Sequence, residues 1–111
     1  MIFIIYCGVA EANHTIAVFN KTSTTFTKFN SEQNGICADG EAVQSNPPLP
    51  IRPYSQTQQP TQLTFPAQQA CVLMLDPDQS ISIAQNTDGT ILMQCALTYH
   101  CKLVQNNLTI Q

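Results

Sequence analysis

Short runs in which apolar and polar residues alternate recur along this chain of 111 residues, without the 3.6-residue spacing of an amphipathic helix. The runs are rich in β-branched and aromatic residues, which is typical of β-strands. The expected strands cover residues 15–19, 24–29, 63–65, 71–75, 80–85, 91–99 and 102–105. The pattern therefore predicts an all-β fold, a small antiparallel β-sandwich with immunoglobulin-like layers.

Two turn sequences between residues 71 and 95 predict a three-stranded meander. Asn86-Thr87-Asp88-Gly89 suits a three-residue hairpin loop, which places Gln85 opposite Ile91. Asp76-Pro77-Asp78-Gln79 suits a type I turn that pairs Leu75 with Ser80. Together the two turns predict a single apolar face, made of Val72, Met74, Ile81, Ile83, Ile91, Met93 and Cys95.

The first twelve residues resemble a secretory signal peptide. An apolar run at 2–10 is followed by the small residues of Ala10-Glu11-Ala12, and the run is too short to span a membrane. Cleavage would remove Cys7 and leave an even number of cysteines, as a disulfide framework requires. No Lys or Arg precedes the run, and a first β-strand is the alternative interpretation. We expect a signal peptide at 1–12, one secreted domain at 13–111, and an extracellular or periplasmic location.

The remaining cysteines, Cys37, Cys71, Cys95 and Cys101, can pair in three ways. In the predicted register Cys71 and Cys95 lie on opposite faces and several residues apart along the strand direction, which disfavours a bridge between them. The pairs are then 37–71 with 95–101, or 37–95 with 71–101. Cys95 can reach Cys101 only if residues 96–100 form a loop, because an extended chain would hold them about 20 Å apart. We favour 37–71 with 95–101.

The composition restricts the classes of partner. Only 10% of the residues are charged, against about 25% in typical globular chains, and the net charge is −3. Four scattered Lys and Arg residues cannot neutralise a run of phosphates, so we expect neither nucleic acid nor an anionic membrane as a partner. We expect a monomer that binds an unknown protein or surface ligand. Three Asn-x-Thr triplets are candidate glycosylation sites in a eukaryotic host, at Asn13, Asn20 and Asn107.

Between residues 30 and 62 the strand periodicity disappears, and the chain becomes rich in Pro, Gln and Asn. A loop this long in a small domain usually carries function, so this segment is the first candidate for a binding surface. The candidate binding residues are Pro47, Pro50, Arg52 and Tyr54. The stretch 47–52 also resembles the proline-rich peptides bound by SH3 domains, with Arg two places after PxxP. A delivered effector that binds SH3 domains is therefore an alternative function.

The sequence also resembles a calcium-binding loop in one place. Asn30-x-Glu32-x-Asn34-Gly35-x5-Glu41 has the glycine and the final Glu of an EF-hand at the right spacing. However, Asn30 replaces the first Asp, and the preceding residues 24–29 are strand-like where a helix is required. We therefore expect no metal site, and a calcium-binding protein remains an alternative.

Candidate catalytic residues do not form a recognisable constellation. The spacing of the carboxylates does not suit glycoside hydrolysis, and a nucleophile elbow, a phosphate-binding glycine loop and zinc-ligand spacing are absent. His100 and Cys101 are neighbours on an expected strand, where their side chains point to opposite faces. A small hydrolase, a further alternative, would need a concave site joining His14 or His100 to carboxylates. We expect a secreted, non-catalytic binding protein without a cofactor.

Overall fold

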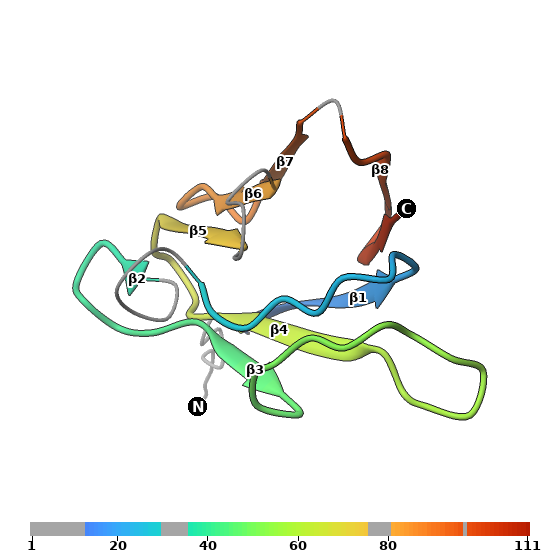
Figure 1. The fold of residues 1–111 in the computed structure, drawn as a ribbon. Coiled ribbons are helices and arrows are strands. Elements are labelled where there is room, and N and C mark those ends of the chain that lie inside the picture. The colour runs from blue at the N-terminus through green and yellow to red at the C-terminus, as the bar shows by residue number, and fades with distance from the viewer. Residues whose placement is uncertain (1–12, 30–35, 76–80, 97) are drawn as a thin grey trace, which may run out of the picture.

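The computed structural model describes residues 13–29, 36–75, 81–96 and 98–111, and within these ranges the chain is all-β, without a helix. The strands form two sheets (Figure 1). The five-stranded sheet has the order β3-β4-β1-β9-β8, with β1 (His14–Asn20), β3 (Gln44–Asn46), β4 (Thr61–Phe65), β8 (Cys101–Val104) and β9 (Asn107–Ile110). The four-stranded sheet has the order β2-β5-β6-β7, with β2 (Ile36–Cys37), β5 (Cys71–Leu75), β6 (Ile81–Gln85) and β7 (Ile91–Cys95).

Side chains from both sheets form one apolar core. The alternation along β4 and β6 buries every second residue, as expected for strands with one inward face. The largest fully buried side chains are Ile16, Phe26, Phe29, Ile51, Leu63, Phe65, Leu73, Leu75, Ile81, Ile83, Leu108 and Ile110. Burial of a Leu, Ile or Phe side chain contributes about 1.5–3 kcal/mol, so this core stabilises the two layers together.

One sheet departs from the expected antiparallel arrangement. β1 pairs with β4 antiparallel but with β9 parallel, so that Ala17 lies opposite Asn107 and Asn20 opposite Ile110. The prediction of an antiparallel fold is therefore wrong at this pair. The strand β9 was not expected either, although Leu108 and Ile110 are buried and Asn107 is exposed.

Two other expected strands are shorter than predicted or missing. Residues 24–29 form only two isolated bridges, Phe26 with Ile51 and Phe29 with Leu75. The segment pairs at one end with the Pro-rich stretch and at the other with β5, and it does not run alongside either of them as a strand. The strand expected at 91–99 ends at Cys95, where a turn follows that is closed by a bond from Tyr99 N to Ala96 O.

The predicted meander register is confirmed for one strand pair and wrong for the other. Gln85 lies opposite Ile91, Ile83 opposite Met93 and Ile81 opposite Cys95, as expected. In the β5–β6 pair, however, Leu75 lies opposite Ile81 instead of Ser80. A shift of one residue moves a strand's side chains to the other face. Leu73 and Leu75 are consequently buried, while Val72 and Met74 are 50% and 36% exposed. The predicted turn at 76–79 and Ser80 lie outside the described residues.

The disulfide pairing favoured from the sequence is confirmed: Cys37 bonds Cys71 and Cys95 bonds Cys101. The first bridge joins direct neighbours in the four-stranded sheet. The second links β7 of that sheet to β8 of the other, across a Cα–Cα distance of 6.1 Å. Of the two reasons against a bridge between Cys71 and Cys95, the opposite faces are wrong and the separation along the strands is confirmed. Both lie on the inner face, but at opposite ends of β6, about 13 Å apart along the strand.

Within the described ranges the chain has no helix that is long and apolar enough to cross a membrane.

Candidate functional site

The Pro-rich segment forms the wall of a cavity of about 330 Å³ at the C-terminal end of β1. All four candidate binding residues from the sequence line it, so the structure brings Pro47, Pro50, Arg52 and Tyr54 together. The other lining residues are Val18, Pro48, Leu49, Gln58, Gln59, Pro60 and Thr61. We call this cavity the Pro-rich cavity.

Backbone bonds to buried residues hold the wall of the Pro-rich cavity in place. Ile51 is fully buried, and its backbone exchanges two hydrogen bonds with that of Phe26, with N···O distances of 3.0 and 2.7 Å. Tyr54 N donates to Asn20 O at 2.6 Å, and the Tyr54 ring meets Phe19 edge-on with centroids 5.2 Å apart. The segment therefore has a defined shape, because core contacts anchor it on both sides of Arg52.

Asn20 is the polar centre of this anchor. Its side chain is 1% exposed, and Nδ2 donates to Thr24 O at 2.8 Å and to Ile51 O at 3.3 Å. Its Oδ1 accepts from Thr22 N and from the Thr22 hydroxyl. A glycan on Nδ2 would have to displace these contacts, and glycosylation at Asn20 stays a prediction from the sequence. Asn13 and Asn107 are exposed.

The groups in the Pro-rich cavity suit binding. Among its lining residues Arg52 is the single charged side chain, and Tyr54, Gln58 and Gln59 supply hydrogen-bonding groups beside apolar proline rings. Among the described residues that line it there is no His, Cys, Asp or Glu. A cavity with a few polar groups on an apolar wall is typical of ligand recognition.

An exposed apolar row lies on the outer face of the four-stranded sheet. Val72, Ala84 and Leu92 are direct neighbours across β5, β6 and β7, and Val72 and Leu92 are 50% and 56% exposed. β2 runs beside Val72, so the row adjoins the segment expected to carry the binding surface. Clustered exposed apolar groups often mark interaction sites.

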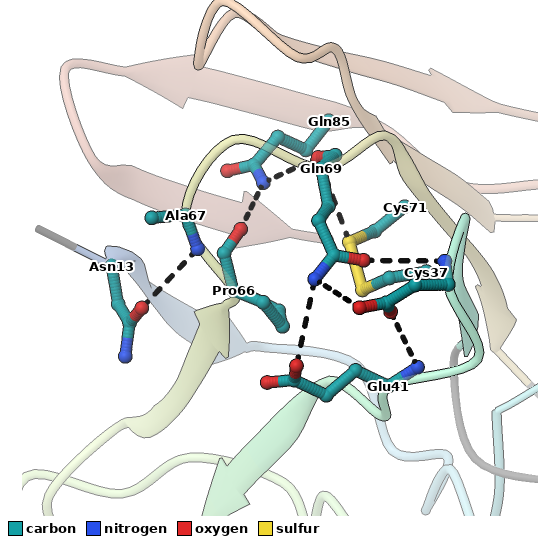
Figure 2. The surroundings of a disulfide bond; sticks show 9 residues. Asn13, Cys37, Glu41, Pro66, Ala67, Gln69, Cys71 and Gln85 are labelled. Atoms are coloured by element: carbon teal, nitrogen blue, oxygen red, sulfur yellow. Dashed lines mark hydrogen bonds between the residues drawn. A yellow bond between two sulfur atoms is a disulfide. The ribbon is translucent and has the colours of Figure 1, made fainter. Parts of the chain in front are cut away.

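The carboxylates at the end of the calcium-like sequence are part of a hydrogen-bonded turn next to the Cys37–Cys71 bridge (Figure 2). Asp39 Oδ1 accepts from Glu41 N at 2.9 Å, and Asp39 Oδ2 accepts from Gln69 Nε2 at 2.8 Å. Gly40 has a φ of +89° and donates to Cys37 O, as a tight loop requires. Residues 30–35 of that sequence lie outside the described ranges. The described residues contain no group of three or more His, Cys, Asp and Glu arranged to hold a metal ion.

The two histidines lie in separate cavities. His14 lines a cavity of about 190 Å³ together with one carboxylate, Asp88, whereas His100 lines one of about 390 Å³ between Lys21 and Lys102. Cys101 beside His100 is disulfide-bonded and carries no thiol. The cavity of His14 therefore meets, in part, the condition set for a hydrolase. Sequence analysis missed this juxtaposition, because His14 and Asp88 come from strands and loops far apart in the chain.

No protein-family model matches the chain, and none of the curated proteins or solved structures compared with it matches. Its function must be inferred from its own residues.

Proposed function

We propose that this chain is a secreted, non-catalytic binding domain that recognises a protein or surface ligand at the Pro-rich cavity. The observation that carries the proposal is that Pro47, Pro50, Arg52 and Tyr54 line one cavity, held by backbone bonds to the buried core. An irregular segment fixed in this way loses little conformational freedom on binding, and such pre-organisation favours affinity.

Two disulfides support the secreted part of the proposal. Disulfides persist in extracellular and periplasmic compartments and are rare in the cytosol. The apolar run before residue 13 is consistent with a signal peptide that is removed on export. Residues 1–12 themselves lie outside the described ranges, so their role rests on the sequence pattern alone.

We further propose that the two sheets pack as a β-sandwich with layers like those of immunoglobulin domains. Buried residues from both sheets belong to one core cluster, and a disulfide connects β7 to β8 across the layers. In a sandwich of this kind the irregular connections are free to carry binding residues. The Pro-rich cavity would then lie beside the edge strand β3, whose last residue, Asn46, precedes Pro47.

In the alternative function, the same segment is a ligand of SH3 domains and is contacted by different groups. An SH3 domain would contact the two prolines and Arg52 from outside, whereas a ligand of the cavity would also contact Gln58 and Gln59, which line it as well. The side chains of these two glutamines are exposed, and no bond to a core residue is seen for either, so they can be changed without disturbing the anchor.

The experiment compares two variants for binding to purified SH3 domains and to cell surfaces, using the labelled protein. We expect cell-surface binding that falls about two- to tenfold in both Arg52→Ala and Gln58→Ala/Gln59→Ala, since each change removes one or two hydrogen bonds of about 0.5–1.5 kcal/mol. Lys102→Ala, an exposed change on β8, serves as the control. Binding to SH3 domains that is lost in Arg52→Ala and retained in the glutamine variant would favour the alternative. Cell-surface binding unaffected by both variants would refute the cavity.

A further inference from the structure

The edge strand β7 lacks the features that usually keep a sheet edge from pairing with another strand. Within the described ranges the edges of the two sheets are β3 and β8, and β2 and β7. Natural proteins protect such edges with very short strands, with Lys or with Pro. β2 and β3 have two and three residues, and β8 carries Lys102. β7 has five residues, Ile-Leu-Met-Gln-Cys, without a charge or a proline.

The free edge of β7 presents the backbone groups of every second residue. The ladder with β6 begins at the turn, where Asn86 N donates to Thr90 O at 2.9 Å. Bonded and non-bonded pairs alternate along an antiparallel ladder, so the next bonded residues of β7 are Leu92 and Gln94. The residues whose backbone N–H and C=O groups point away from β6 are therefore Ile91, Met93 and Cys95. In the described part of the chain no backbone bond from another segment reaches these three residues.

The apolar core is incompletely covered on the side of the molecule that carries β7 and β8, at the upper right in Figure 1. Seven described apolar residues pack against the core but are only partly buried, and all except Leu49 come from β7, from β8 or from the turn between them. They are Ile91, Met93, Cys95, Tyr99, Cys101 and Leu103. A strand added at this edge would cover apolar surface and also accept and donate backbone hydrogen bonds.

We propose that β7 pairs antiparallel with β7 of a second copy of the chain, about a two-fold axis that passes beside Met93. In this register Met93 lies opposite its own counterpart, and Ile91 lies opposite Cys95 of the second copy. All three outward-pointing residues are then paired, and each of the three pairs exchanges two hydrogen bonds. An axis at Leu92 would leave Cys95 without a strand partner, and an axis at Gln94 would leave Ile91 without one.

The side chains of β7 are also compatible with their own copies across this axis. On the inner face the register brings together only apolar residues, because Ile91, Met93 and Cys95 all point inward. On the outer face Leu92, which is 56% exposed, lies diagonal to its counterpart at about 7–8 Å, within reach of a long side chain. No side chain of β7 is charged, so like charges do not oppose each other across the axis.

The small size of the contact predicts a weak dimer. Five residues at about 3.4 Å each give an edge about 17 Å long, and the two layers of a sandwich lie about 10 Å apart. Such an edge is much smaller than the roughly 800 Å² that each partner buries in a standard interface. We therefore expect the monomer at low concentration and a dimer that becomes populated between about 10 µM and 1 mM. The contact uses the same edge of both copies, so assembly stops at the dimer.

The first test measures the mass and the amide exchange of the full chain without any ligand. We expect sedimentation equilibrium to show a reversible monomer–dimer transition over this concentration range. Hydrogen exchange followed by NMR locates the contact, because dimerisation would protect the amides of Ile91, Met93 and Cys95. We expect their exchange to slow by about threefold or more between dilute and concentrated samples. The amides of Leu92 and Gln94 already bond to β6 and should change little.

Two variants place a charge at the proposed axis without touching the core. Leu92→Lys and Gln94→Lys change exposed side chains, and each brings two like charges to diagonal positions across the axis. We expect each to lower the association constant about tenfold or more, as Lys does at protected edges. Val72→Lys is the matched control, because Val72 is 50% exposed on the same face of the sheet but lies two strands away from the edge. It should dimerise like the unchanged protein.

Four results would overturn the proposal. The first is a chain that stays monomeric up to about 1 mM, and the second is an assembly that grows beyond the dimer. The third is an association constant unchanged in both Leu92→Lys and Gln94→Lys, which would assign association to another surface. The fourth is a dimer that leaves the exchange of the amides at 91, 93 and 95 unaffected. None of these variants changes a residue of the Pro-rich cavity, so failure here is distinguishable from failure of the proposed function.

Discussion

Leu73 lies directly opposite Ile83 in the antiparallel pair of β5 and β6, and both side chains are fully buried. This pairing decides which face of β5 belongs to the core. The neighbouring Val72 lies opposite Ala84 and is half exposed on the outer face.

Leu73→Ala is therefore expected to lower the free energy of unfolding by about 2–5 kcal/mol, since it leaves a cavity in the core. Val72→Ala is expected to change it by about 0.5 kcal/mol or less, because the side chain is half in solvent. Urea unfolding followed by circular dichroism measures both. The register predicted from the sequence requires the opposite order, so a larger loss in Val72→Ala would contradict the structure.

The β5 register could not be predicted because all five residues from Cys71 to Leu75 are apolar, so alternation does not select a face. In the β6–β7 hairpin, by contrast, Gly89 marks the turn, and Asn86 N bonds to Thr90 O. Local turn chemistry fixed that register. The parallel partner of β1 left no local signal, because Ala17 and Asn107 come from opposite ends of the described chain.

The candidate site was predictable in part for the same reason. The proline content of residues 47–60 identified one wall of the Pro-rich cavity. The contributions of Val18 and Thr61 depend on how β1 and β4 pair, because the two residues lie opposite each other only in the folded sheet.

The two disulfides are expected to stabilise the fold by different amounts. Chain-entropy arguments assign about 4 kcal/mol to the Cys37–Cys71 bridge and about 2.5 kcal/mol to Cys95–Cys101, because the sequence separations are 34 and 6. Denaturant unfolding of Cys37→Ala/Cys71→Ala and of Cys95→Ala/Cys101→Ala compares them. A larger loss in the second variant would show that the link between the sheets contributes more than loop closure.

Asn20→Ala is expected to lower the free energy of unfolding by about 2–3 kcal/mol. The change removes the donor to the buried Ile51 carbonyl and the acceptor for Thr22 N, which leaves polar backbone groups without partners. Thermal and urea unfolding measure the loss. Asn107→Ala, in an exposed asparagine of the same triplet type, is the matched control and should lie within about 0.5 kcal/mol of the unchanged protein. Equal effects of the two changes would contradict the anchoring role.

Gln105→Gly is expected to stabilise the protein by about 0.5–1 kcal/mol. Gln105 begins the two-residue turn between β8 and β9 and has a φ of +54°, a region that glycine adopts without steric cost. Asn106→Gly, at the neighbouring turn position, has no positive φ to relieve and should not stabilise. The midpoint of urea unfolding compares the two variants, and destabilisation by Gln105→Gly would argue against this turn geometry.

The parallel pairing of β1 with β9 also governs when the protein can finish folding. Synthesis releases β1 early, but its neighbour on one side consists of residues 107–110, which leave the ribosome long afterwards. Until then β1 has an open edge, and β8 has nothing to join it to the rest of its sheet. The five-stranded sheet is thus completed only after residue 110 is available.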